Sequence, residues 1–196
     1  DREIHLDTQP GWQSLFAADA RFQRILTVDW NDRRQRIRQI ATWLRQVRAW
    51  NYDLVIDLQC NDRSRFLLSL LWLSGQRIRY RLGNRRQFPY NIAPAELPKP
   101  SHILLRSRAA LQAGSIPTTS LRPVLHIPER NRTHASDLIQ RHELSPSGYA
   151  IFLPGCNASG YLKRWGAARY AALANRLHRE GLKQIVLIGG TDEVDE

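Results

Sequence analysis

The stretch LPGCNASGYLKRWGAARYAALA begins at residue 153 and carries residue types that bind phosphate. Gly155, Asn157 and Ser159 allow a tight turn just beyond the carboxyl end of an expected strand, which is where open α/β sheets bind ligands. Free N–H groups at the start of the following helix add partial positive charge, and Lys163 adds a compact full charge. The stretch therefore fits an anion site, and it fits equally an ordinary strand-to-helix turn with solvated basic residues.

Several familiar catalytic and metal motifs are excluded. Gly155 and Gly160 have half the spacing of a P-loop, but Tyr161 and Leu162 stand where that motif needs Lys and Ser/Thr. No serine lies in a GxSxG elbow, and the six histidines have no HExxH or other metal-ligand spacing. The two cysteines are 96 residues apart without a CxxC pair, which fits a reducing compartment and predicts no zinc site.

A second polar cluster lies in DLQCNDRSR, which begins at Asp57. Gln59 and Arg63 follow the end of an expected buried strand, again at the ligand-binding edge of a parallel sheet. The ordinary alternative is that Asp62 caps the next helix and Arg65 lies in solvent.

Charge gives a broad constraint on partners. The formal net charge is +11, and because only three of the 29 basic residues are lysines, 26 are arginines. This excess predicts attraction to nucleic acid, anionic lipid, phosphorylated sugar or nucleotide. Arginines on the polar side of residues 32–50 fit either a solvated face or a membrane surface. A basic nucleic-acid-binding module is the rival from another class, but we find no RNP-like, zinc-finger or helix-turn-helix pattern.

Short apolar runs alternate with helical patterns, which predicts an α/β fold with a mostly parallel sheet. The expected strands are 3–7, 24–30, 52–59, 77–83, 122–128, 149–154 and 184–190, and the expected helices are 11–19, 32–50, 63–75, 101–114, 132–144 and 165–180. Ser101 is the expected N-cap of its helix, and Gly75 is expected to end another.

Apolar stripes at helical spacing predict which helix faces are buried. The stripe residues are Ile37, Ile40, Leu44 and Val47 in one helix, and Tyr170, Leu173, Ala174 and Leu177 in another. The SPSG segment before Tyr149 is the strongest boundary signal, so we expect one domain over residues 1–147 and a second from residue 148 to 196.

Five segments, in this order, resemble the heptosyltransferases. They are YDLVIDLQCNDRS, RIRYRLG, SHILLRSRAALQAG, YAIFLPGCNASGYLKRWGAARYAALANRLHREG and IVLIGG. This is the lipopolysaccharide-core family of glycosyltransferases (glycosyltransferase family 9), bacterial enzymes of the two-domain GT-B type. The resemblance implies that residues 1–147 are an acceptor-binding Rossmann-like domain without its first strand. It also implies that residues 148–196 are the first βαβ unit of a Rossmann-like domain that binds the nucleotide-sugar donor.

The resemblance also implies a reaction. Such enzymes transfer a heptose from ADP-heptose to the inner core on phosphorylated lipid A, at the cytoplasmic face of the inner membrane. The transfer inverts the anomeric centre, and neither a metal nor another cofactor is expected. Basic side chains and helix N-termini would stabilise the leaving diphosphate. A GT-B transferase that uses another nucleotide sugar is the enzymatic alternative, and nucleic acid is not an expected partner.

Roles follow residue by residue from the family's motifs. Lys163 matches the lysine that contacts the donor diphosphate, in a loop with Gly155, Asn157 and Ser159. The acceptor-binding candidates are Arg63, Gln59 and Arg106. Asp192 and Glu193 are weaker candidates for the donor ribose.

The chain departs from the family pattern at several places. Cys60 replaces a usual glycine, which would matter if the turn needs a positive φ. Gly166 replaces a usual proline after KRW. The catalytic aspartate is expected upstream of residue 1, and a glycine-rich nucleotide loop beyond Glu196. Because the chain also lacks methionine, we expect both ends to be cut and the chain alone to be an inactive fragment.

Overall fold

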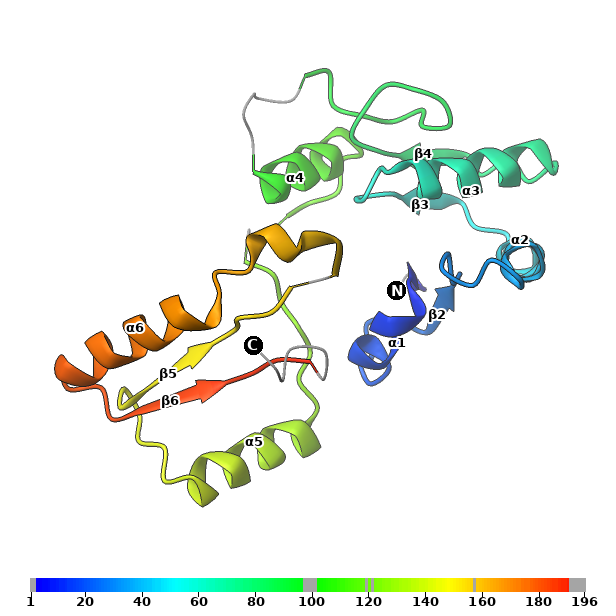
Figure 1. Cartoon of the computed structure of the whole chain (residues 1–196). Coiled ribbons are helices and arrows are strands. Elements are labelled where there is room, and N and C mark those ends of the chain that lie inside the picture. Colours follow the sequence, from blue (N-terminus) through cyan, green and yellow to red (C-terminus); the bar gives the residue numbers. More distant parts are fainter. Residues whose placement is uncertain (1–2, 97–101, 119, 121, 157, 191–196) are drawn as a thin grey trace. The chain divides into compact units, whose positions relative to one another are not determined.

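The computed structural model describes residues 3–96, 102–118, 120, 122–156 and 158–190 (Figure 1). The chain divides into two compact units, residues 1–126 and 127–196. Each unit is built from parallel strands joined by helical crossovers, as the alternating pattern predicts.

The first unit contains two parallel strand pairs. β1 (His5–Thr8) pairs with β2 (Arg24–Thr27), and β3 (Leu54–Ile56) pairs with β4 (Tyr80–Leu82). The intervening helices are α1 (Pro10–Phe16), α2 (Arg36–Trp50) and α3 (Asp62–Leu73), and α4 (Ile103–Ala113) follows. Because the strands are parallel, the carboxyl ends of the two strands in each pair lie at the same edge. The polar cluster after β3 begins at such an edge.

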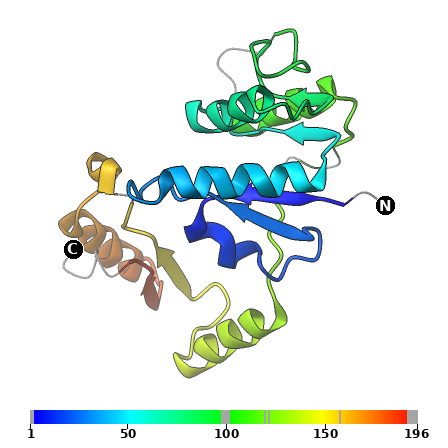
Figure 2. The ribbon, with the colours of Figure 1, turned by 90° about the vertical axis from the view of Figure 1, so that its right-hand side faces the viewer.

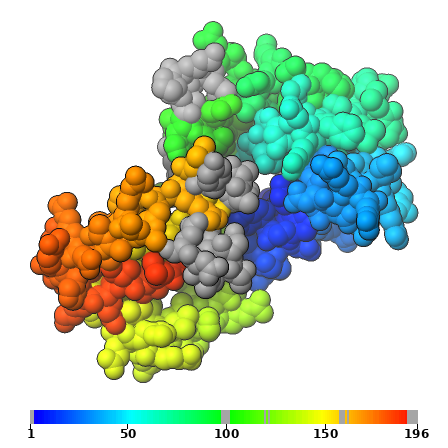
Figure 3. Space-filling model, in the orientation of Figure 1, coloured from blue at the N-terminus to red at the C-terminus, as the bar shows by residue number. Residues whose placement is uncertain are grey.

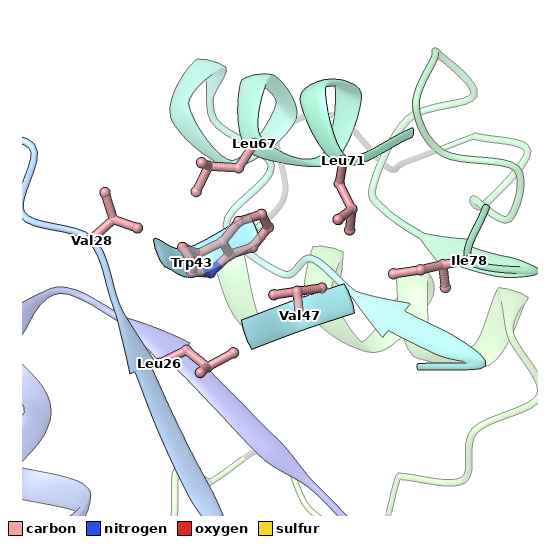
Figure 4. Close-up of a cluster of buried hydrophobic side chains, with 7 residues drawn as sticks. All are labelled: Leu26, Val28, Trp43, Val47, Leu67, Leu71 and Ile78. Atoms are coloured by element: carbon pink, nitrogen blue, oxygen red, sulfur yellow. The ribbon is translucent and has the colours of Figure 1, made fainter. Parts of the chain in front are cut away.

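The core of this unit lies where α2 and α3 meet β2 and the segment before β4 (Figure 4). Its buried side chains are Leu26, Val28, Trp43, Val47, Leu67, Leu71 and Ile78. Leu71 is the most enclosed, at 1% exposure.

The predicted stripe of α2 is right except at its first position. Val47 is buried, and Ile40 and Leu44 pack against the core. Ile37, in the first turn of α2, is 84% exposed, and Trp43 supplies the large buried side chain instead. The prediction for Ile37 was therefore wrong.

Local hydrogen bonds explain where the helices begin. α2 begins at Arg36 rather than at residue 32, because Oδ1 of Asp32 accepts the N–H groups of Arg34 and Gln35 and holds a turn there. α4 is capped by His102, whose ring accepts the N–H of Leu104; Ser101, the predicted cap, lies outside the described residues. α3 ends at Leu73, with Ser74 as its C-cap, and Gly75 follows at φ +91° as the predicted terminating glycine.

The second unit is one strand–helix–strand crossover with a helix before it. α5 (Glu129–Arg141) precedes β5 (Tyr149–Phe152), and α6 (Ala167–Arg179) leads to the parallel strand β6 (Gln184–Leu187). Figure 1 shows β5 and β6 between α5 and α6. The outer side of α6 lies on the surface of this unit (orange in Figure 3).

The predicted inner face of α6 is also its less exposed face. Tyr170, Leu173, Ala174 and Leu177 are partly buried, whereas the intervening residues are exposed. The Tyr170 ring lies 5.4 Å from that of Phe152 on β5, which joins helix to strand.

One predicted strand is absent. Residues 122–128 form no strand, because Pro123 and Pro128 lack the N–H that a ladder needs. A different contact holds the segment: Arg21, paired with Asp19, donates a hydrogen bond to the carbonyl of Val124 at 3.1 Å.

The division between the two compact units lies earlier in the sequence than the predicted domain boundary. The division falls after His126, so α5 groups with the second unit rather than with residues 1–147. Figure 2 shows the same chain from the side, with α5 following the linking segment. The assignment of the units to acceptor and donor stays a prediction.

Candidate functional site

The turn after β3 is organised by one buried carboxylate. Asp57 is 8% exposed, and its Oδ1 accepts the N–H groups of Gln59 at 3.0 Å and Cys60 at 2.7 Å. Its Oδ2 accepts the hydroxyl of Tyr90 at 2.5 Å. The side chain at the strand end therefore fixes the backbone of the residues that follow.

Cys60 lies at the bend of this turn, at φ +49°. The position where the family has glycine thus uses a positive φ, and cysteine adopts it here. Two contacts hold the thiol: its Sγ donates to the carbonyl of Asp57 at 2.8 Å and accepts the N–H of Asn84 at 3.2 Å. Burial raises the pKa of the Cys60 thiol.

A reciprocal cap starts α3. The Asn61 side chain accepts the N–H of Ser64 at 2.9 Å, and Ser64 Oγ accepts the N–H of Asn61 at 3.2 Å. Asp62, the cap in the alternative interpretation of this segment, instead lies in the first turn, where its Oδ1 is 3.7 Å from Nη1 of Arg65. Arg65 is partly buried rather than fully in solvent.

The structure places two of the acceptor-binding candidates at this edge. Gln59 and Arg63 are exposed, and the Arg63 guanidinium lies 5.7 Å from the ring of Trp30, in the loop after β2. Arg106 on α4 is half-buried, and its charge acts on the Cys60 thiol, where it lowers the pKa against the larger effect of burial. A polar turn flanked by cations can bind an anionic group.

The donor candidates lie in the second unit. A short 3₁₀-helix (Ala158–Lys163) follows the β5 loop, and α6 begins only at Ala167, so Lys163 ends the 3₁₀-helix rather than lying at the mouth of α6. Lys163 is exposed, and its side chain lies close enough to Gly160 that a Cβ there would be 3.6 Å from Lys163 Cδ. Arg164 Nη2 donates to the carbonyl of Cys156 at 3.4 Å.

Several predicted donor residues cannot be located. Asn157, Asp192 and Glu193 lie outside the described residues, as does the side chain of Ser159. Gly155 lies in the loop after β5 as predicted.

No helix in the described part of the chain is long and apolar enough to cross a membrane. The described residues also contain no group of three or more His, Cys, Asp or Glu side chains placed to hold a metal.

Sequence reasoning missed Tyr90, Asn84 and Gly83. They lie in or beside residues 84–100, which read as an irregular loop, and no periodicity marks them. The glycine at position 83 is a signal in the sequence that could have indicated a close approach of another residue. In the structure a Cβ at Gly83 would lie 2.5 Å from the Tyr90 ring, so only glycine permits this packing.

The fold defines the class of protein first. A crystal structure of a glycosyl transferase of family 9 from Veillonella parvula DSM 2008 matches 98% of this chain with a TM-score of 0.72 and 21% sequence identity. This match confirms the α/β, GT-B-like fold. The chain covers 56% of that protein, about half its length.

The family follows from the sequence match. Residues 40–196 match the family model described as glycosyltransferase family 9 (heptosyltransferase), so the chain belongs to this family. No curated protein matches the chain significantly.

Proposed function

We propose that the complete protein containing this chain is a glycosyltransferase that moves a heptose from ADP-heptose to the lipopolysaccharide inner core. The transfer inverts the anomeric centre and uses neither metal nor another cofactor. Membership of family 9 supports the reaction class. None of the described residues is assigned the role of catalytic base.

The proposal that the first unit binds the acceptor rests on the basic side chains at the carboxyl end of β3. Arg63 is exposed on the first turn of α3, Gln59 is exposed in the turn before that helix, and the charge of Arg106 acts on Cys60 in the same turn. Phosphate groups of a lipid A–core acceptor would bind these guanidinium groups by charge-assisted hydrogen bonds. With a net charge of +11, the protein would work as a peripheral protein at the anionic cytoplasmic face of the inner membrane.

The donor half of the proposal concerns the β5 loop. Gly155, Asn157 and Ser159 would let the backbone approach the donor diphosphate, and exposed Lys163 would neutralise charge as the diphosphate leaves. Asp192 and Glu193 would contact the ribose.

The test uses the complete protein encoded at the locus, assayed with ADP-heptose and a phosphorylated inner-core acceptor. Lys163→Ala should lower kcat/KM about 100-fold, as expected when a group stabilising the leaving charge is lost. Lys183→Ala is the matched control, because Lys183 is an exposed lysine beside β6 in the same unit. A Lys163→Ala variant with unchanged donor affinity and rate would remove the diphosphate role.

A second pair of variants tests the acceptor side. Arg106→Ala should raise the acceptor KM, whereas Arg108→Ala, an exposed arginine on the same helix, should not. Turnover of UDP- or GDP-sugars in place of ADP-heptose would contradict the donor assignment while leaving the reaction class intact.

A further inference from the structure

We propose that Tyr90 is a positioning residue for the acceptor half of the site: its hydroxyl holds Asp57, which holds the turn that presents Gln59 and Arg63. The inference rests on the proposed function, because it needs Gln59 and Arg63 to contact the acceptor.

The first step is the carboxylate of Asp57, both of whose oxygens are used. Oδ1 accepts two backbone N–H groups of the turn, from Gln59 and Cys60, and Oδ2 accepts the Tyr90 hydroxyl. Asp57 is buried, so an oxygen that lost its donor would be left without water. Tyr90 therefore completes the set of donors that keeps this carboxylate in one orientation.

The second step is the placement of the Tyr90 ring. Tyr90 is 7% exposed, and its ring packs directly over Gly83 at the end of β4. The segment that carries it is bonded to β4 on both sides of the ring: Arg81 Nε donates to the carbonyl of Pro89, and the N–H of Asn91 donates to the carbonyl of Arg81 at 2.9 Å. The hydroxyl thus reaches Asp57 from a rigid support.

The third step runs from the turn to the exposed side chains. Cys60 at positive φ is followed at once by the Asn61 cap, so hydrogen bonds hold the backbone N–H groups of Gln59, Cys60 and Asn61 between Asp57 and the first turn of α3. Gln59 lies inside this clamp, and Arg63 lies one residue before Ser64, which closes the cap. A shift of Asp57 would move both side chains, whereas the donor candidates belong to the other compact unit.

The protonation state suits this role. Burial raises the pKa of Tyr90, with the neighbouring Asp57 adding to the effect, so the hydroxyl remains a donor at neutral pH. The Tyr90 side chain is neutral and buried, so we infer that it affects acceptor binding only through the turn.

The experiment compares Tyr90→Phe with wild type in the complete protein. Loss of one net hydrogen bond from the turn should raise the acceptor KM about 3- to 10-fold. The donor KM should not change. Tyr52→Phe is the matched control, because it removes another tyrosine hydroxyl bond in the same unit, to His5, away from this edge. A Tyr90→Phe variant with unchanged acceptor KM would overturn the inference.

A double-mutant cycle separates positioning from general destabilisation. If Tyr90 acts by presenting Arg63, the Tyr90→Phe effect on acceptor KM should shrink clearly in an Arg63→Ala background. An undiminished effect in that background would count against the role.

Hydrogen exchange keeps the inference separate from the proposed function. Tyr90→Phe should speed exchange of the Gln59 and Cys60 amides, which donate to Asp57. If the wild-type protein transferred no sugar to any inner-core acceptor, the proposed function would fail on its own. Unchanged exchange at these two amides would defeat the positioning role in either case.

Discussion

At the scale of single residues, Cys60 balances opposing contributions. A non-glycine residue in the left-handed region costs about 1–2 kcal/mol. The two thiol hydrogen bonds offset part of this strain, and glycine would lose more freedom on folding, by about 0.5–1 kcal/mol. The family's usual glycine and this chain's cysteine are therefore closer in stability than the backbone angle alone implies.

We predict that Cys60→Gly changes the free energy of unfolding by less than about 1 kcal/mol, because relief of strain and loss of contacts nearly cancel. Cys60→Val should destabilise by at least about 1 kcal/mol more, since a β-branched residue tolerates this conformation poorly and donates no hydrogen bond. Urea unfolding of the two variants measures both values. Equal stability of the Gly and Val variants would contradict a strained turn.

Asp7 gives a prediction about pH. Burial against α2 raises the pKa of its carboxyl from 3.8 to about 6, opposed by the hydrogen bond from Trp43 and supported by repulsion from Asp57. Between these values the folded state holds a proton that the unfolded chain has released, so the stability this proton contributes is present below pH 3.8 and lost as the pH rises through about 6.

We expect Asp7→Asn to be more stable than wild type at pH 7.5 but not at pH 4, because the amide never ionises and can still accept the Trp43 N–H. Although protein groups surround the carboxyl, solvent still reaches the residue as a whole, so screening should keep the gain in stability small. Urea midpoints at the two pH values test this. A gain that is the same at both would show that charge is not its cause.

At the scale of elements, the start of α6 differs from what the family pattern implies. Gly166, where a proline is usual, is the N-cap at φ +90° and ψ 147°, a conformation closed to proline. Its carbonyl accepts the N–H groups of Arg169 and Tyr170, so this conformation sets how the helix begins.

We predict that Gly166→Ala destabilises the second unit by about 1–3 kcal/mol, because this backbone region is nearly restricted to glycine. Gly11→Ala is the control: a Cβ there meets nothing within 4 Å, and alanine in helix α1 should stabilise by about 0.4–1 kcal/mol. Thermal unfolding followed by circular dichroism compares the two. A neutral Gly166→Ala would mean that α6 starts differently in solution.

The order and type of most elements could be predicted because apolar periodicity reflects burial directly. Their lengths could not, since a strand ends where its partner ends: the expected strand 52–59 pairs only over Leu54–Ile56. The prediction of a strand over residues 122–128 was wrong because their apolar pattern is typical of a strand. The segment is held instead by a hydrogen bond from Arg21, which is distant in the sequence.

The same limit applies to the site. Gln59, Arg63 and Gly155 could be placed at strand ends because parallel topology fixes that edge. Tyr90 could not be predicted, because its role depends on a ring returning from an irregular segment to a carboxylate 33 positions earlier. Contacts of that kind leave no periodic trace in a sequence.

At the scale of the whole molecule, each compact unit has its own interior. The buried cluster around Leu71 draws only on residues of the first unit, while β5, β6 and α6 pack among themselves. A destabilising substitution in the interior of one unit should therefore lower the stability of that unit and leave the other unit unchanged.

We predict that Leu71→Ala lowers the stability of the first unit by about 2–5 kcal/mol, as large-to-small changes at fully buried sites do. Hydrogen exchange should show protection lost in α2 and α3 but retained in β5 and β6. Equal loss of protection in both units would show that they unfold as one.

The preference for arginine leaves few primary amines in this chain. Within this chain, amine-reactive reagents can modify only the side chains of Lys163, Lys183 and Lys99, and the last lies outside the described residues. Peptide mass spectrometry after mild acetylation would thus report on Lys163 with Lys183 as an internal reference, without any substitution. If Lys163 binds the donor diphosphate in the complete protein, ADP-heptose should shield its amine there while Lys183 reacts at its usual rate.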